Sequence, residues 1–412
     1  MNCRICNTLI EEPFLSLKNS PLANSYLSKE NLYKKEEYYP LNLYFCNNCK
    51  LVQVDDFVSS KEIFNPQYAY YSGYSQTWIE HCKNYVDYIV KRISLDKKSK
   101  VLEIGSNDGI LLEQFKSYNV PVKGIEPAEE AADIAIKKGI DTLKTFFNNK
   151  LVYNSPELLH QDLIIANNVI AHNPDLKDLV SSMKHILKYD GVITVEFPHL
   201  LNLILYNQFD TVYHEHFSYF SLTSIQKLFK QHNLIIFDVE EIPTHGGSLR
   251  IYAKHDDNIT HQVKSNVENI LIKESEFGLN NLSTYINFKN KIEELKRNIL
   301  KLLITLKDNQ FKNRKYKICA YSAPAKASTL LNYCGIGTDF VEYTVDLNPQ
   351  KQNKYIPGTH IPIYHPDKIK EDKPEYVIIF AWNIKDEIIK QLDYIREWNG
   401  KFITLIPEPD VI

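Results

Sequence analysis

Two closely spaced cysteine pairs near the start of the chain have the pattern of metal ligands. Cys3 and Cys6 form one C-x-x-C pair, and Cys46 and Cys49 form another after a gap of 39 residues. Each pair can place two thiolates on one ion, so two pairs complete a closed tetrahedral zinc site. The alternatives are a redox dithiol and a chance spacing, but a redox pair usually sits at a helix N-terminus. Four thiolates leave no open position, so we expect a structural zinc ion.

A glycine-bearing turn farther along the chain has the composition of a cofactor site. Glu103-Ile-Gly105-Ser-Asn-Asp108-Gly109 follows a buried apolar run, and Glu126 comes 23 residues after Glu103. Glycines let a ligand approach the backbone, and an acid at the end of the next strand can accept both hydroxyls of an adenosine ribose. A dinucleotide fold expects G-x-G-x-x-G, whereas an acid upstream of the glycine fits S-adenosylmethionine (SAM). The turn therefore favours a SAM-dependent methyltransferase over a dinucleotide enzyme or a non-catalytic relative.

Alternating strands and helices are predicted to position these residues. Apolar runs bounded by turn residues predict strands of an open, mostly parallel sheet at 100–104, 122–126, 162–166 and 191–196, closed by 234–239 and 248–253. A proline-free stretch at about 262–312 is predicted to form long helices that bridge two domains.

A second alternation follows and echoes the first. Strands are predicted at 316–321, 341–346, 376–380 and 401–406. In both halves a strand leads through a turn of small residues into a helix, and the next strand ends in an acid, Glu126 or Asp346. This is a repeat of architecture without residue identity.

The predicted fold class is α/β with three parts. Residues 1–65 form a small zinc-binding module, because so short a segment has little core of its own. Residues 66–260 form a Rossmann-like SAM methyltransferase domain, and residues 261–412 form a second, C-terminal α/β Rossmann-like domain. The three cysteines outside the pairs are expected in the core; they are Cys82, Cys319 and Cys334.

Composition excludes several classes of protein. The 412 residues are 44% apolar and carry a formal charge of −3, which argues against a globally basic nucleic-acid binder. The sequence contains no apolar run of the roughly 20 residues needed to span a bilayer. The first residues lack the basic and apolar regions of a signal peptide. We therefore expect a cytoplasmic protein with reduced thiols, bound neither to nucleic acid nor to a membrane.

The chain resembles the C-methyltransferases of deoxysugar biosynthesis, which act on nucleotide-linked 4-keto sugars. The resemblance runs nearly end to end and includes the paired cysteines of an N-terminal zinc-binding domain. It also includes the SAM loop at 103–109, Tyr213-His-Glu-His-Phe-Ser-Tyr-Phe220, Ser322-Ala-Pro-Ala-Lys-Ala and Lys354-Tyr-Ile-Pro-Gly-Thr-His360. The family usually has glycine where this chain has Ser322, which puts local turn geometry in doubt.

The segment Tyr213-His214-Glu215-His216 is interpreted as acid–base machinery. Two histidines at i and i+2 on a strand would also suit a metal, or a satisfied core pair. Carbon methylation from a sulfonium requires a carbon nucleophile, which the carbon beside a ketone supplies as an enolate. The resemblance implies His216 as the base at C3 of the sugar, with Tyr213 and Glu215 close by, and His172 as a further active-site residue.

The resemblance also implies the residues that contact the two ligands. The aromatic stretch that contains Tyr71, Ser72 and Ser75 either covers the cofactor or packs on the zinc module. The pair Phe146 and Phe147 either covers adenine or packs in the core. The predicted cofactor contacts are Tyr71, Ser72, Ser75, Glu103, Gly105, Asn107, Asp108, Glu126, Pro127, Phe146 and Asn168. The predicted contacts of the nucleotide sugar are Ser322, Lys326, Asp346 and Lys354, with His360 as a further candidate. The alternative is a pseudo-repeat that forms only an interdomain surface.

The predicted function is SAM-dependent C-methylation of a nucleotide-linked 4-keto deoxysugar, at the carbon beside the ketone, by a monomeric enzyme. Methylation of an oxygen or nitrogen on a sugar is the first alternative, and it needs no enolate. A non-catalytic scaffold with a methyltransferase fold is the second.

Overall fold

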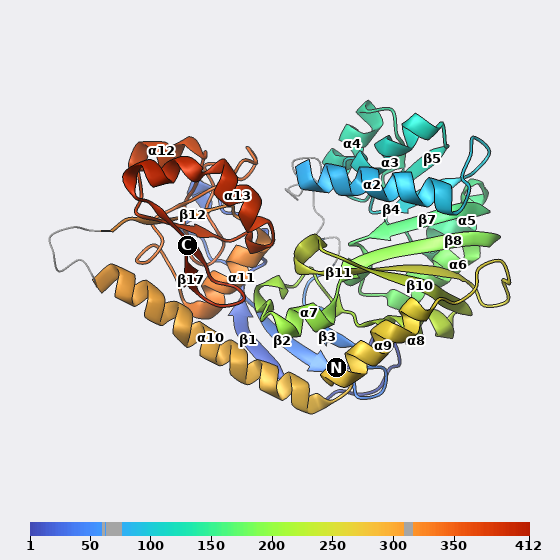
Figure 1. The fold of residues 1–412 in the computed structure, drawn as a ribbon, viewed down its shortest axis with the longest axis horizontal. Coiled ribbons are helices and arrows are strands. Elements are labelled where there is room, and N and C mark those ends of the chain that lie inside the picture. The colour runs from blue at the N-terminus through green and yellow to red at the C-terminus, as the bar shows by residue number, and fades with distance from the viewer. Residues whose placement is uncertain (60–61, 63–75, 309–315) are drawn as a thin grey trace.

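The computed structural model describes residues 1–59, 62, 76–308 and 316–412. Its strands form three sheets of four, seven and six strands. In Figure 1 the six-stranded sheet and its helices lie on the left, the seven-stranded sheet lies on the right, and the N-terminal strands lie below and between them with helix α10. This arrangement confirms the predicted α/β class with a small N-terminal module.

The N-terminal sheet is antiparallel and takes its last strand from a distant part of the chain. Its order is β1-β2-β3-β9. Val52 of β3 pairs with Tyr219, and Gln53 pairs with Ser218. The strands are β1 (Leu15–Ser20), β2 (Tyr39–Phe45), β3 (Val52–Val54) and β9 (Ser218–Tyr219). Since β9 directly follows the Tyr213–Phe217 segment, the module is attached to the candidate catalytic residues.

The seven-stranded sheet has the order β10-β11-β8-β7-β4-β5-β6. Five neighbouring strands, from β8 to β6, are parallel, and β11 runs antiparallel to β8. The strands are β4 (Val101–Ile104), β5 (Val122–Ile125), β6 (Asp141–Leu143), β7 (Gln161–Asn167), β8 (Leu187–Pro198), β10 (Leu234–Ile242) and β11 (Ser248–His255). Parallel strands bring their carboxyl ends to one edge, where ligands bind, and the Gly105 turn and Glu126 lie at that edge.

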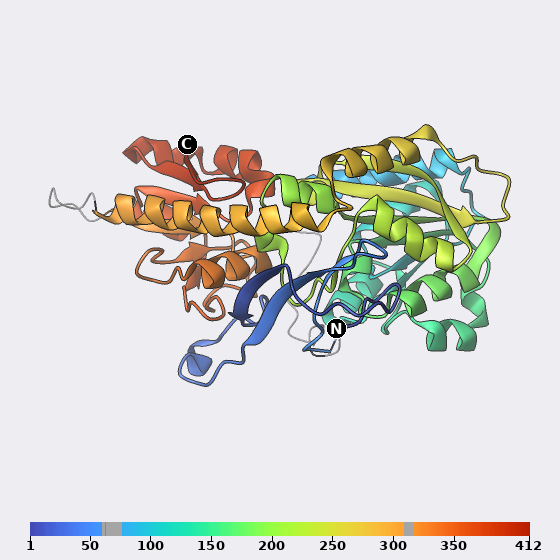
Figure 2. The same cartoon turned by 90° about the horizontal axis from the view of Figure 1, so that it is seen from below.

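Helices cover both faces of this sheet (Figures 1 and 2). They are α2 (Gln76–Arg92), α3 (Ile110–Gln114), α4 (Glu129–Lys137), α5 (Asn149–Asn154), α6 (Leu176–Ile186), α8 (Leu222–Gln231) and α9 (Ser265–Phe277). Helix α7 (Leu200–Leu205) instead packs its apolar residues into the core of the N-terminal sheet. In the described part of the chain, no helix is both long enough and apolar enough to cross a membrane.

The C-terminal sheet repeats the parallel design on a smaller scale, in the order β14-β13-β12-β15-β16-β17, with only β17 antiparallel. Its strands are β12 (Ile318–Tyr321), β13 (Thr344–Val345), β14 (Ile363–Tyr364), β15 (Tyr376–Ile379), β16 (Lys401–Thr404) and β17 (Asp410–Val411). Its helices are α11 (Ala325–Cys334), α12 (Asp367–Asp372) and α13 (Lys385–Gln391).

The predicted helical stretch before this sheet divides in two. Helix α9 ends at Gly278, whose φ of 87° suits the left-handed turn that stops a helix. Helix α10 (Leu282–Asp308) then runs 27 residues along the base of the molecule (Figure 2). The ring of its Tyr285 stacks on Phe45 of β2 with ring centroids 4.2 Å apart. The core of the N-terminal sheet is therefore continuous with α10 rather than closed on itself.

Candidate active site and metal centre

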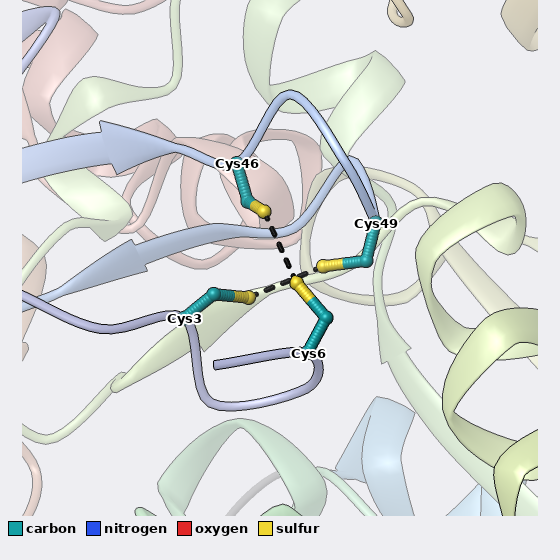
Figure 3. Close-up of side chains that lie close together, drawn as sticks. All are labelled: Cys3, Cys6, Cys46 and Cys49. Carbon is teal, nitrogen blue, oxygen red and sulfur yellow. Dashed lines mark hydrogen bonds between the residues drawn. The ribbon is translucent and has the colours of Figure 1, made fainter. Parts of the chain in front are cut away.

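The four predicted metal ligands come together in the N-terminal module. Their sulfur atoms all lie within 4.8 Å of one another. Figure 3 shows the four side chains converging from two loops, with Cys3 opposite Cys49 at 3.2 Å and Cys6 opposite Cys46 at 3.5 Å between sulfurs. Tetrahedral zinc with Zn–S bonds of about 2.3 Å separates its sulfurs by about 3.8 Å. The cluster therefore fits one zinc ion held by four thiolates.

The two cysteine turns have the same backbone geometry. Asn7 N donates to Cys3 O at 2.9 Å, and Lys50 N donates to Cys46 O at 2.8 Å. Asn7 and Lys50 each follow the second cysteine of a pair, and both have a positive φ, 59° and 66°. Two equivalent turns aim their thiolates at one point, which is the arrangement that a closed structural metal site requires.

The glycine turn after β4 packs its backbone closely against Val169 at the carboxyl edge of the sheet. Gly105 has a φ of 67°, and a Cβ there would lie 2.6 Å from Val169 Cγ2. At the end of β5, Glu126 Oε2 accepts from Asn107 N and Oε1 accepts from Ala128 N, both at 2.8 Å. These bonds fix the carboxylate at the strand edge, and each oxygen keeps a lone pair for a ribose hydroxyl.

Glu103 is a buried acid beside this turn. Burial, followed by the charges of Glu126, Asp108 and Glu196, raises the pKa of Glu103 well above its usual range. Within the described residues, its Oε2 atom is buried without a hydrogen-bond partner. An orphaned carboxylate oxygen fits a polar or positively charged ligand group such as the amino-acid end of SAM.

One large cavity extends from the carboxyl edge of the seven-stranded sheet to the N-terminal module and the C-terminal domain. Its volume is about 810 Å³, and its wall includes residues of all three parts of the chain. The cavity wall includes these predicted cofactor contacts: Gly105, Asn107, Glu126, Pro127, Phe146 and Asn168. Glu103 and Asp108 are buried behind that lining. Tyr71, Ser72 and Ser75 lie outside the described residues.

Tyr213 and His216 form a hydrogen-bonded pair in the wall of the cavity. His216 Nδ1 lies 2.9 Å from Thr211 O, and because a carbonyl only accepts, Nδ1 carries the proton. In the neutral ring the lone pair is then on Nε2, which accepts from the Tyr213 hydroxyl at 2.9 Å. Burial, followed by the charge of His172, lowers the pKa of His216 well below its usual value. His216 is therefore held as a neutral base with its acceptor nitrogen on a tyrosine hydroxyl.

Two further histidines lie near this pair. The His172 ring centroid is 4.7 Å from that of His216, and burial lowers the pKa of His172 to about 4. His245 also lines the cavity, where Asn168 Nδ2 lies 3.3 Å from its Nε2. Sequence reasoning missed His245; its signal was the His-Gly-Gly sequence at a turn between two strands.

The carboxylate of Glu215 also faces the cavity and is 4% exposed as a residue. Asn24 Nδ2 lies 2.8 and 2.9 Å from its two oxygens. Burial raises the pKa of Glu215 to about 7. The acid can therefore exist in either protonation state near neutral pH. Sequence reasoning missed Asn24, which comes from the N-terminal module.

The carboxyl edge of the C-terminal sheet has the same backbone hydrogen bonds as the carboxyl edge of the seven-stranded sheet. Ser322 N donates to Val345 O just as Gly105 N donates to Ile125 O, each at 2.7 Å. Asp346 accepts from Ala323 N at 2.8 Å and from Asn348 N at 2.9 Å, as Glu126 accepts from two backbone amides. The repeat predicted as architecture therefore extends to individual hydrogen bonds. Ser322 adopts a φ of 74°, a conformation that glycine prefers.

Lys326 is a partly buried cation on this side of the cavity. Its Nζ donates to Asn383 Oδ1 at 2.7 Å and lies 4.2 Å from the centroid of the Trp382 ring. Burial lowers the pKa of Lys326 to about 8, and the charge of Asp210 opposes that shift. Ser322, Lys326 and Asp346 all line the cavity, whereas Lys354 and His360 are outside its lining. His360 Nε2 instead lies 2.5 Å from Glu36 Oε1 of the N-terminal module.

Comparison with known proteins accounts for the whole chain. Three family models match: "Putative zinc binding domain" at 3–64, "Methyltransferase domain" at 78–238 and "C-methyltransferase C-terminal domain" at 243–407. The C-methyltransferase NovU of Streptomyces niveus is 32% identical over 415 residues, which cover 100% of this chain and 96% of NovU. The chain belongs to this C-methyltransferase family.

Two other similarities are confined to the methyltransferase region. The ubiquinone biosynthesis O-methyltransferase of Actinobacillus pleuropneumoniae serotype 7 is 30% identical over 118 residues, 26% of this chain and 49% of that protein. The structure of magnesium protoporphyrin IX methyltransferase from Synechocystis PCC 6803 with bound SAH covers 43% of this chain and 82% of its own, at 15% identity and a TM-score of 0.35. Neither extends over all three parts, as NovU does.

The C-methyltransferase family gives the site its chemistry. The protein is a SAM-dependent C-methyltransferase with a zinc-binding module. When bound, SAM supplies an electrophilic methyl group on a sulfonium sulfur. The glycine turn, Glu103 and Glu126 fit that cofactor, and Cys3, Cys6, Cys46 and Cys49 fit the metal.

Proposed function

We propose that the enzyme methylates C3 of a nucleotide-linked 4-keto deoxysugar through an enolate. The supporting observation is the hydrogen-bonded chain from Tyr213 through His216 to Thr211 O. It lies in the wall of the cavity between the carboxyl edge of the seven-stranded sheet, the candidate SAM site, and the C-terminal sheet. Carbon methylation needs a base and an oxyanion donor at one substrate carbon. The chain supplies both groups within one pair.

The proposed proton transfer follows from this geometry. The Tyr213 hydroxyl turns from His216 Nε2 to the C4 ketone oxygen of the sugar, which frees the nitrogen lone pair. Nε2 then takes the C3 proton; the C–H electrons form the C3–C4 double bond and the negative charge moves to the ketone oxygen. The bond from His216 Nδ1 to Thr211 O holds the ring while Nε2 gains the proton. The imidazolium is stabilised by the neighbouring oxyanion.

The C-terminal edge is assigned to the nucleotide diphosphate. Lys326 is a partly buried cation that lines the cavity and suits a phosphate charge. Asp346 occupies the position that Glu126 occupies at the SAM edge, with its carboxylate fixed by two backbone amides. We therefore assign Asp346 to a sugar hydroxyl of the nucleotide and Lys326 to its diphosphate.

Hydrogen exchange tests this proposal without methyl transfer. A dTDP-linked and a UDP-linked 4-keto-6-deoxyhexose are each incubated in D2O with enzyme and no methyl donor, and H3 and H5 are followed by proton NMR. Both carbons flank the ketone, so exchange of H3 that far outpaces H5 supports a base aimed at C3. His216→Asn is the control and should not accelerate exchange. Methyl transfer without exchange at either carbon would favour methylation of an oxygen or nitrogen instead.

A further inference from the structure

The N-terminal module holds the candidate catalytic segment from behind. Arg4, inside the first cysteine turn, donates through Nη1 to Phe217 O at 3.0 Å and to Val54 O at 2.7 Å. Val54 N also donates to Phe217 O, at 3.1 Å. His214 Nε2 donates to Pro40 O at 3.2 Å. The module therefore fixes the residues on either side of Glu215 and His216.

A side chain of the same module enters the cavity itself. Asn24 lines the cavity, and its Nδ2 contacts both oxygens of the Glu215 carboxylate. Tyr26 anchors this part of the module on the C-terminal domain, since its hydroxyl donates to Ala323 O at 2.6 Å and lies 3.2 Å from Asn24 Oδ1. Asn24 thus lies between the catalytic segment and the turn that precedes α11.

We propose that Asn24 is a positioning residue that holds the Glu215 carboxylate toward the substrate, so that the cysteine module forms part of the active site. The inference rests on the proposed function in that the substrate is taken to occupy the cavity that Glu215 lines. An amide nitrogen that contacts both oxygens fixes the direction in which the carboxylate points. Side chains that exchange protons with a substrate need such a fixed orientation, because a small displacement of a catalytic group lowers the reaction rate by a large factor.

The groups around Glu215 define what Asn24 contributes. Burial raises the pKa of Glu215, while the Asn24 hydrogen bond and then the charge of Lys351 lower it. On the backbone side, the ring of His172 hydrogen-bonds to the Glu215 carbonyl. Removing Asn24 leaves burial opposed by Lys351 alone. The Glu215 pKa should therefore rise further, and its carboxylate should no longer be held in one direction.

The test compares Asn24→Ala and the isosteric Asn24→Asp with Asn31→Ala, which changes an exposed asparagine of the same module. The Glu215 carboxyl carbon is followed by NMR against pH in protein labelled with 13C-glutamate, and its signal is assigned by its loss in Glu215→Gln. Zinc content reports whether the module is folded. In both Asn24 variants the Glu215 pKa should rise, and more so in Asn24→Asp, where a carboxylate replaces the donor. C3 exchange should fall about tenfold or more at pH 7, with wild-type values in Asn31→Ala.

The two proposals fail in different ways. An unchanged Glu215 titration in zinc-loaded Asn24→Ala and Asn24→Asp overturns the positioning role, whatever the substrate is. A raised Glu215 pKa in those variants, together with no exchange at C3 by wild-type enzyme, supports the positioning role and removes the proposed reaction. A raised pKa with undiminished exchange would mean that Asn24 holds Glu215 without serving catalysis, and would overturn the inference.

Discussion

Replacing Glu126 by alanine should weaken SAM binding at least about tenfold. The carboxylate is fixed at the end of β5 by Asn107 N and Ala128 N, and it is 5% exposed. Hydrogen bonds to a charged group contribute about 1.5–3 kcal/mol each, and about 1.4 kcal/mol is one decade of affinity. Losing even one ribose hydroxyl contact therefore reaches tenfold, and losing two exceeds one hundredfold.

The matched variant is Asp346→Ala, which removes the corresponding carboxylate from the C-terminal edge. Calorimetry with SAM and with a nucleotide sugar, each added separately, gives four affinities. Glu126→Ala should weaken SAM and spare the nucleotide sugar, and Asp346→Ala should do the reverse. Both variants leave two backbone amides without their acceptor, so thermal unfolding is measured alongside. If Glu126→Ala weakened the sugar nucleotide and spared SAM, the two sheets would have been assigned the wrong ligands.

Three further outcomes are expected. His216→Asn should slow C3 exchange about 10²–10⁴-fold with SAM affinity near wild type in calorimetry; a variant that keeps more than half the activity would remove His216 as the base. Cys46→Ser should give unstable or insoluble protein, since metal binding is part of the folding energy of the module; a normally folded variant that holds one zinc ion per chain and loses only turnover contradicts that role. Because the pKa of Glu103 in the folded protein lies well above its usual value of 4.5, Glu103 stays protonated at pH values where the unfolded chain has lost that proton. The free energy of unfolding of the wild type should therefore fall as the pH rises above about 4.5. Glu103→Gln should raise the melting temperature of the SAM-free protein more at pH 8 than at pH 5; an equal gain at both pH values would contradict the shifted pKa.

Much of the fold was predictable from local patterns. The strands expected at 100–104, 162–166 and 376–380 correspond to β4, β7 and β15. Apolar runs between turn residues specify buried parallel strands because both faces of such strands are covered. Short edge strands such as β6, β14 and β17 escaped prediction, since two or three residues carry no periodicity to detect.

The candidate site was predictable where a motif keeps its residues adjacent in the chain. The glycine turn, the cysteine pairs and the Tyr213–His216 segment all follow this rule. Asn24 and Lys351 line the cavity without a motif of their own, and His245 is marked only by the two glycines that follow it. Each is brought there by packing between parts of the chain far apart in sequence, and single polar residues in turns have too many other uses to be distinguished.

The sequence by itself indicated the types of group at the candidate sites: four thiolates for a metal, a glycine turn with two acids as the candidate SAM site, and a Tyr-His-Glu-His segment proposed for acid–base work. Local residue type and spacing are sufficient there, because each group forms within one turn or one pair of turns. Only the tertiary structure decided that β9 completes the N-terminal sheet and that Asn24 faces Glu215. It also decided that the His216 lone pair faces a tyrosine hydroxyl rather than solvent. The first two arrangements depend on contacts between segments about 170–190 residues apart, which packing of the whole chain brings together and no local pattern records. The third lies within six residues of chain, but the ring orientation that produces it follows from the folded backbone and not from the residue types.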